Sequence, residues 1–359
     1  MAIPVVFSCN QHPVARHRIS PRPLSPHFIS RRVTATIAAF VAVLLWGMNV
    51  QAKTFTDDLG RDVEVPDHPT RIISLYDVDV TIPLIELGVF PIASHGRIGL
   101  DGTPYLRSSR LLTGVDFDNS DIRYIGSTEI DLETITALAP DLIITAPGRA
   151  SAIEPLQAIA PTVSLDAARL GGPHVYQKLA ELTGRQDALK YLEARYQANI
   201  AALKRNLNPS DITVSVLQPL NGKINIYHTY RSLGRVLRDA EFKFPALIDN
   251  IAPSGRLQVS PEYLPDLDAD YIFDPFRDDR NNGAKAEIRA MNDIFPDFCR
   301  FLRACRDGRY ILVSREIAIS NSYGALSMMT ALITSHIVAD RFRPPSGPAT
   351  KSPENAPKP

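Results

Sequence analysis

Apolar residues recur every three or four positions through residues 185–207, a stretch that contains neither Pro nor Gly. Charged and amide side chains occupy most of the remaining positions. This period predicts an amphipathic α-helix, about 34 Å long at 1.5 Å per residue. Short apolar runs alternate with helical patterns on both sides of it. We therefore expect the helix to join two α/β lobes.

The flanking sequences contain a repeat. Residues 131–144 and 260–273 share one pattern, in which a loop and a short helical segment precede a buried apolar strand. At one constant offset the pattern aligns Glu133 with Glu262 and Asp141 with Asp270. Two copies of one αβ unit, one on each side of the long helix, predict two similarly built lobes.

The pattern divides the chain into five parts. We expect an export signal at residues 1–52, an N-terminal α/β lobe at 53–184, an interlobe helix at 185–207, a C-terminal α/β lobe at 208–342 and a disordered Pro-rich tail at 343–359. The N-terminal lobe opens with a hairpin over 55–65, and the C-terminal lobe with a hairpin around the turn at 219–222. Elsewhere strands alternate with helices, which favours parallel sheet.

The first 52 residues resemble a targeting segment. They contain five Arg and no acidic residue, and an uncharged apolar run fills positions 33–50. Small residues near Ala52 suit cleavage there, with a mature start at Lys53, which predicts a soluble periplasmic protein. An uncleaved membrane anchor is the alternative, because the apolar run is close to spanning length.

Charge excludes one class of partner. The whole chain has 39 basic and 39 acidic residues, so that 39 − 5 = 34 basic residues remain beyond the leader. A net acidic mature chain argues against nucleic acid as the main ligand.

Two cysteines lie beyond the leader. Cys299 and Cys305 could pair in an oxidising compartment or remain as two thiols. If their segment is one regular helix, a spacing of six places the side chains on different faces, too far apart to bridge.

The hairpin and the segments after it resemble a known family. FTDDLGRDVEVPDHPTRIISL, LGVFPIAS and IGSTEIDLETITALAPDLIIT are similar to the periplasmic binding proteins that serve ABC importers of ferric siderophores, haem and cobalamin. The resemblance extends over about residues 53–342. It implies two Rossmann-like lobes joined by a single long rigid helix, with ligand held between them and then delivered to an inner-membrane ABC permease. It also implies permease docking by one acidic residue on each lobe, at Glu133 and Glu262.

Candidate ligand contacts lie in loops that follow predicted strands, because open α/β sheets bind ligands beyond the carboxyl ends of their strands. These loops are rich in Arg and Tyr, which bind anionic oxygens by bidentate hydrogen bonds and by stacking. We expect a ferric siderophore complex with net negative charge, with Arg149, Arg256 and Arg277 as the main contacts. The full candidate set is Tyr76, Arg97, Tyr105, Arg149, Tyr230, Arg231, Arg256, Arg277, Arg315 and Tyr323.

Other functions fit the sequence less well. Cobalamin or haem would suit the same fold. A direct Zn or Mn binding protein needs three or four clustered ligands, whereas only His95 and His228 lie in candidate loops. A siderophore hydrolase is a further alternative, but no common catalytic motif is present. We expect a monomer without enzymatic activity, without an intrinsic cofactor and without a direct metal ligand set, which carries iron as the chelate.

Overall fold

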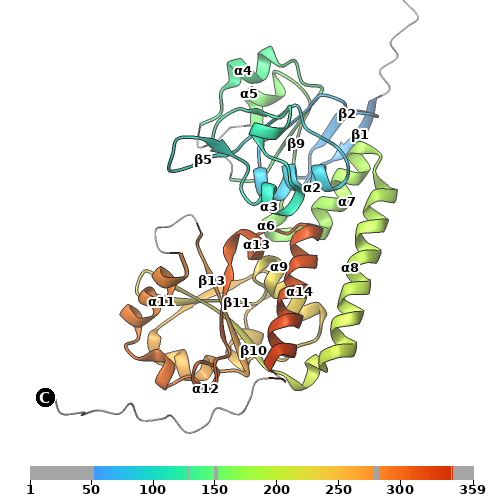
Figure 1. Cartoon of the computed structure of the whole chain (residues 1–359). Coiled ribbons are helices and arrows are strands. Elements are labelled where there is room, and N and C mark those ends of the chain that lie inside the picture. Colours follow the sequence, from blue (N-terminus) through green and yellow to red (C-terminus); the bar gives the residue numbers. More distant parts are fainter. Residues whose placement is uncertain (1–51, 128, 149–152, 279–282, 341, 343–359) are drawn as a thin grey trace, which may run out of the picture. The chain divides into compact units, whose positions relative to one another are not determined.

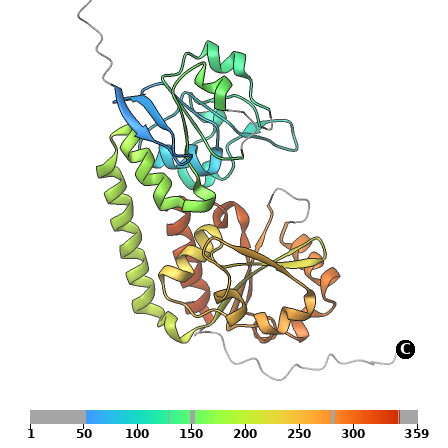
Figure 2. The ribbon, with the colours of Figure 1, turned by 180° about the vertical axis from the view of Figure 1, so that it is seen from behind.

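The computed structural model describes residues 52–127, 129–148, 153–278, 283–340 and 342 (Figure 1). The predicted signal segment, the predicted tail and Arg149 fall outside the described residues. The first elements are β1 (Ala52–Thr56) and β2 (Asp62–Pro66), which form the expected antiparallel hairpin. Lys178 on α7 (Gly172–Thr183) lies over the Phe55 ring. The hairpin lies beside that helix (Figure 2).

The first sheet is wholly parallel. It comprises β3 (Ile72–Ser74), β4 (Ala93–Ser94), β7 (Arg123–Tyr124), β8 (Leu142–Thr145) and β9 (Thr162–Ser164), in the order β7-β4-β3-β8-β9. In chain order this is 3-2-1-4-5, the arrangement of a Rossmann-like sheet. The other elements of this part are the π-helix η1 (Asp77–Thr81), α2 (Ile82–Glu86), the hairpin β5 (Arg97–Ile98) and β6 (Pro104–Tyr105), α3 (Ser109–Thr113), η2 (Phe117–Asn119), α4 (Leu132–Ala137), α5 (Ile153–Gln157), α6 (Ala167–Leu170) and α7.

The second sheet is mixed. Its strands are β10 (Val214–Leu220), β11 (Lys223–Tyr227), β12 (Arg256–Val259), β13 (Tyr271–Phe276) and β14 (Tyr310–Ser314), in the order β12-β11-β10-β13-β14. The β10–β11 hairpin and the β11–β12 pair are antiparallel, whereas β10, β13 and β14 run parallel. The other elements here are η3 (Pro209–Asp211), α9 (Arg231–Asp239), α10 (Ala246–Asp249), η4 (Pro261–Leu267), α11 (Gly283–Ile294), η5 (Phe298–Arg300), α12 (Arg303–Arg306), α13 (Arg315–Ala318) and α14 (Tyr323–Asp340).

The two sheets have the same strand order, and the sequence repeat supplies their equivalent strands β8 and β13. The aligned aspartates make the same contact in each copy. Asp141 accepts hydrogen bonds from the backbone amides of Thr70 and Arg71, just before the central strand β3. Asp270 accepts one from the amide of Thr213, just before the central strand β10. We call the parts that carry the first and second sheets the N-terminal and C-terminal lobes.

Between the two sheets in sequence lies α8 (Gln186–Leu207). Leu189, Leu192, Tyr196, Ile200, Leu203 and Leu207 are buried on it, which is the predicted apolar stripe. The Tyr196 hydroxyl donates to Asp239 on α9 at 2.8 Å. At the end of the helix Asn208 adopts a left-handed conformation, a common way for a helix to stop.

Cys299 and Cys305 form a disulfide, with their Cα atoms 4.9 Å apart. The segment is not one regular helix. The turn η5 ends at Arg300 and α12 begins at Arg303, so the backbone bends between the two cysteines and brings their side chains together.

Candidate functional site

A cavity of about 660 Å³ lies between the α6–α7 region of the N-terminal lobe and several loops of the C-terminal lobe. The C-terminal lobe contributes the segment that joins β11 to α9, the start of β12 and the residues after β14. Four residues of the predicted set line it: Tyr230, Arg231, Arg256 and Arg315.

Two tyrosines and two arginines form one wall. The rings of Tyr227 and Tyr230 meet edge to face with centroids 4.8 Å apart. Burial raises the pKa of Tyr230 to about 12, although the charge of Arg315 acts in the opposite direction. Burial also raises the pKa of Tyr227, opposed by the charges of Arg256 and Arg315. Both phenols therefore stay protonated at neutral pH and can donate hydrogen bonds.

This wall contains buried polar atoms without hydrogen-bond partners. Within the described part of the chain, the Tyr230 hydroxyl, Arg315 Nε and Arg107 Nη2 make no hydrogen bond. A buried donor without a partner costs about 1–3 kcal/mol, so such atoms are rare and call for an explanation. Tyr230 and Arg315 line the cavity, and their two unpartnered atoms suit an incoming group rich in oxygen.

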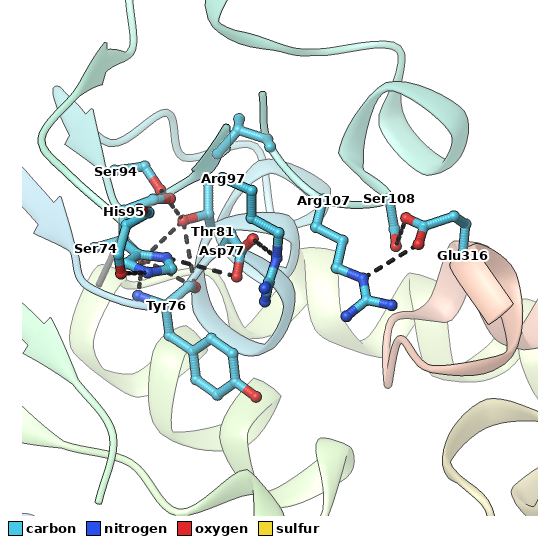
Figure 3. Close-up of polar contacts among 12 residues, drawn as sticks. Ser74, Tyr76, Asp77, Thr81, Ser94, His95, Arg97, Arg107, Ser108 and Glu316 are labelled. Atoms are coloured by element: carbon cyan, nitrogen blue, oxygen red, sulfur yellow. Dashed lines mark hydrogen bonds and ion pairs between the residues drawn. The ribbon is translucent and has the colours of Figure 1, made fainter. Parts of the chain in front are cut away.

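Arg107 reaches this region from the N-terminal lobe, between β6 and α3 (Figure 3). Its Nε donates to Glu316 Oε1 at 3.2 Å, and the neighbouring Ser108 hydroxyl donates to Glu316 Oε2 at 2.9 Å. Glu316 lies on α13 of the C-terminal lobe. The charge of Arg107 also acts on the Tyr230 hydroxyl and favours its ionised form.

A second ion pair joins the lobes. Arg231 Nη1 donates to Asp79 Oδ2 on η1 at 3.0 Å, and Asn321 donates to Asp79 Oδ1 at 3.0 Å. Arg231 is partly exposed and Asp79 is buried. Burial lowers the pKa of Arg231, but the charge of Asp79 outweighs it and the pKa lies above its usual value.

A polar cluster lies at the carboxyl ends of β3 and β4 (Figure 3). Arg97 donates to the buried Asp77 at 3.1 Å, and His95 Nδ1 lies 3.7 Å from the same carboxylate. Burial raises the pKa of Asp77, but His95 and the charge of Arg97 outweigh it and hold the pKa below its usual value. Tyr76 caps η1 next to this cluster, and Tyr105 pairs with Arg97 across the β5–β6 hairpin.

The remaining predicted residues lie elsewhere. Arg277 is half-buried after β13 and does not line the cavity. Tyr323 is buried in the core, where its ring contacts Tyr176 and Tyr196 edge to face. The sequence reasoning did not select Glu316 or Asp79. Acidic side chains are not expected to bind an anion, and the partners of Glu316 and Asp79 lie on the other lobe.

The two predicted docking residues occupy equivalent positions. Glu133 lies in the first turn of α4 and Glu262 in the first turn of η4, and both are exposed. An exposed apolar side chain adjoins each of them, Leu132 in one lobe and Tyr263 in the other. Neither glutamate pairs with a basic side chain in the portion that the structure describes.

Over the described ranges, no three His, Cys, Asp or Glu side chains are grouped so as to hold a metal ion. None of the helices that the structure describes is long and apolar enough to cross a membrane.

The sequence is similar to that of known proteins. The family model described as "Periplasmic binding protein" matches residues 84–291. The chain is 29% identical over 232 residues to the "Probable siderophore-binding lipoprotein YfiY" of Bacillus subtilis, covering 62% of this chain and 68% of that protein. It is 27% identical to the iron(3+)-hydroxamate-binding protein FhuD of the same organism, covering 62% of this chain and 69% of that protein.

The fold is also similar to that of a solved structure. SirA of Staphylococcus aureus, crystallised with staphyloferrin B, superposes with a TM-score of 0.63 at 20% identity, covering 81% of this chain and 98% of that one. At this identity the likeness concerns the fold. The match to the family model extends over more than half of the chain, and the chain therefore belongs to the periplasmic binding protein family.

Proposed function

We propose that this protein binds a ferric siderophore complex of net negative charge in the cavity between its lobes and delivers it to an ABC permease. The observation that carries the proposal is the cavity wall that contains Arg315 and Tyr230, where two buried polar atoms, Arg315 Nε and the Tyr230 hydroxyl, have no hydrogen-bond partner in the described chain. Carboxylate or catecholate oxygens would satisfy these atoms and balance the guanidinium charge.

Charge on the cavity wall supports the sign of the ligand. Asp79 balances Arg231 and Glu316 balances Arg107. Among the described residues, Arg256 and Arg315 make no ion pair with a carboxylate. Two uncompensated cations on one cavity favour an anion over a neutral or cationic ligand.

The relatives support the class of ligand. One is named for siderophore binding, one for a ferric hydroxamate, and the structural neighbour was crystallised with staphyloferrin B. Among siderophore complexes, the arginines of this chain favour an anionic one. Haem and cobalamin are alternative ligands for the same cavity and belong in the same test.

The rest of the proposal concerns location and delivery. We propose that the leader is cleaved near Ala52, that the mature monomer resides in the periplasm and that the lobes divide at residues 184 and 208. Ala52 is the first residue of β1, so cleavage there leaves the hairpin nearly complete. Glu133 and Glu262 would bind the permease, one from each lobe. N-terminal sequencing of periplasmic protein tests the cleavage site, and recovery of residues 33–50 in the membrane fraction would contradict it.

A binding panel tests the ligand. We would titrate the mature protein by intrinsic tyrosine fluorescence with ferric staphyloferrin B, ferric citrate, a ferric catecholate, ferrioxamine B, haemin and cobalamin. We expect the anionic ferric complexes to bind more tightly than ferrioxamine B. Preference for ferrioxamine B, haemin or cobalamin would contradict the proposed charge.

Variants locate the site. Hydrogen bonds to charged groups contribute about 1.5–3 kcal/mol, so Arg256→Ala and Arg315→Ala should each weaken binding of the anionic complex roughly ten- to a hundredfold. Arg169→Ala is the matched control, because Arg169 forms an exposed ion pair with Asp166 and does not line the cavity. Affinities within about twofold of wild type for both cavity variants, well short of the tenfold that about 1.4 kcal/mol gives, would show that ligand binds elsewhere.

A further inference from the structure

One carboxylate of the C-terminal lobe receives two hydrogen bonds from consecutive residues of the N-terminal lobe. Arg107 and Ser108 donate to separate oxygens of Glu316, at 3.2 and 2.9 Å. Both arginine and glutamate are largely buried, with 11% and 20% of their side chains exposed. Reduced exposure to water strengthens such a contact relative to a surface ion pair.

The contact determines how the arginine is presented. Glu316 engages the Nε of Arg107, which leaves the terminal nitrogens for other partners, and Nη2 is buried without one. In Figure 3 the terminal nitrogens lie on the far side of the guanidinium carbon from Nε. Glu316 directly follows Arg315, which lines the cavity, so the contact with Glu316 holds Arg107 near the cavity wall.

The backbone at this contact is unusual. Ser108 has a φ of 64°, in the left-handed region that non-glycine residues seldom occupy. Its side chain is directed at Glu316 while its backbone precedes α3. A conformation of this kind costs on the order of 1 kcal/mol and persists where surrounding contacts maintain it, often at functional sites.

We propose that Glu316 is a positioning residue for the ligand site. It holds Arg107 by Nε from the opposite lobe, so that the terminal nitrogens of Arg107 are available to an anionic ligand next to the cavity wall at Arg315. Ser108 fixes the second oxygen of the carboxylate and so sets its orientation. This inference rests on the proposed function, because it requires an anionic ligand in the cavity.

The proposal distinguishes positioning from simple repulsion. If Glu316 acted only through its negative charge near the cavity, its removal would tighten the binding of an anion. If it acts through Arg107, its removal releases the guanidinium and weakens binding. The sign of the change in affinity therefore separates the two roles.

The test is a double-mutant cycle with ferric staphyloferrin B and ferric citrate as probes. We expect Glu316→Gln to weaken binding about three- to tenfold, Arg107→Ala to weaken it at least as much, and Glu316→Asp to retain more affinity than Glu316→Gln. In the Arg107→Ala background, Glu316→Gln should then change affinity by less than about twofold. Additive losses would show that Glu316 does not act through Arg107, and tighter binding by Glu316→Gln would overturn the proposal.

A matched control and a ligand-independent measurement complete the design. Glu241→Gln removes an ion pair with Lys204 that lies outside the cavity, and it should leave affinity unchanged. Thermal unfolding of the same four proteins in the cycle measures the coupling of Arg107 and Glu316 without ligand, and an absence of coupling there would also count against the proposal.

The outcomes separate this inference from the proposed function. Loss of binding in Arg315→Ala with unchanged binding in Glu316→Gln would retain the anionic site and refute the positioning role. Failure of both anionic complexes to bind the wild-type protein would refute both.

Discussion

A buried carboxylate at the junction of the lobes allows a quantitative prediction. Glu86, the last residue of α2, accepts hydrogen bonds from the Tyr176 hydroxyl and from the backbone amides of Tyr323 and Gly324. The two amides open α14, so Glu86 caps this helix from the N-terminal lobe. Gly324 is required for the approach, because a Cβ there would meet Glu86 Oε1 at 2.7 Å.

The perturbation is Glu86→Gln. Glutamine keeps the shape, but its amide nitrogen is a donor and must face at least one of the three donors that the carboxylate now satisfies. One buried donor without a partner costs about 1–3 kcal/mol, and a lost helix cap about 1 kcal/mol. We expect a loss of about 2–4 kcal/mol in the free energy of unfolding. At about 2.1 cal/mol/K of unfolding entropy per residue, that lowers the Tm of a protein of this size by roughly 3–6 °C.

The assay is thermal unfolding followed by circular dichroism at pH 7. Gly324→Ala should destabilise the protein through the same contact from the other side. The matched control is Glu64→Gln, since Glu64 is exposed and accepts only from Thr54. A change below about 0.5 kcal/mol in Glu86→Gln, the range of ordinary surface substitutions, would refute the reasoning.

The pH dependence gives an independent check. Burial raises the pKa of Glu86 above its ordinary value of 4.5, despite the hydrogen bonds that act in the opposite direction. The folded state then binds the proton of Glu86 more tightly than the unfolded state. The contribution of Glu86 to stability therefore grows as pH falls and is lost as pH rises through the folded pKa. The stability difference between wild type and Glu86→Gln should therefore widen as pH falls towards 4.5.

Three further predictions concern other contacts. Glu133→Ala with Glu262→Ala should abolish siderophore uptake by cells and leave binding of the purified protein unchanged, and unchanged uptake would contradict permease docking. Mature protein denatured without reductant should show no free thiol in a thiol titration, and Cys299→Ser with Cys305→Ser should lose about 2 kcal/mol of stability. The pKa of Asp57 lies below its ordinary value of 3.8, because the contacts with Arg61 and a backbone amide outweigh burial. Asp57→Asn should therefore be less stable than wild type above pH 3.8. This difference in the free energy of unfolding, measured by urea denaturation, should disappear as pH falls through the folded pKa.

The local hydrophobic pattern and the internal repeat predicted much of the fold. The apolar stripe of residues 185–207 became α8 with the same buried residues, because period alone determines which face of a helix can pack. The aligned Asp141 and Asp270 proved to share a contact, each holding the start of the central strand in its own sheet. Repeats reveal such equivalence because the same fold imposes the same backbone donors in both copies.

The cavity was less accessible to sequence reasoning. The sequence places Arg256, Arg315 and Tyr230 in loops that follow predicted strands. Tyr230 and Arg315 do follow strands, whereas Arg256 is the first residue of β12, and all three line the cavity. Glu316 could not be found in this way, since its partner Arg107 is 209 residues away on the other lobe. No rule of local pattern relates residues at that distance unless their lobes are already placed.

Local backbone geometry also escaped the pattern. Ser108 and Arg231 have positive φ angles without being glycine, and each takes part in an ion-paired contact between the lobes. Gly or Asn in a turn predicts such a conformation from the sequence. Ser and Arg do not, because here tertiary contacts rather than local preference maintain it.

The three contacts between the lobes have a common consequence for binding. Glu86 caps α14, Arg107 pairs with Glu316, and Arg231 pairs with Asp79. Each contact forms within this chain and needs no ligand, and the two ion pairs involve arginines at or near the cavity wall. Side chains already held in place lose less conformational freedom when a ligand binds, so more of the free energy of each hydrogen bond contributes to affinity. Under the proposed function, the carboxylates that pair these arginines favour an anion only if the orientation they impose outweighs the negative charge they add, and the affinity of Glu316→Gln measures which of the two effects is larger.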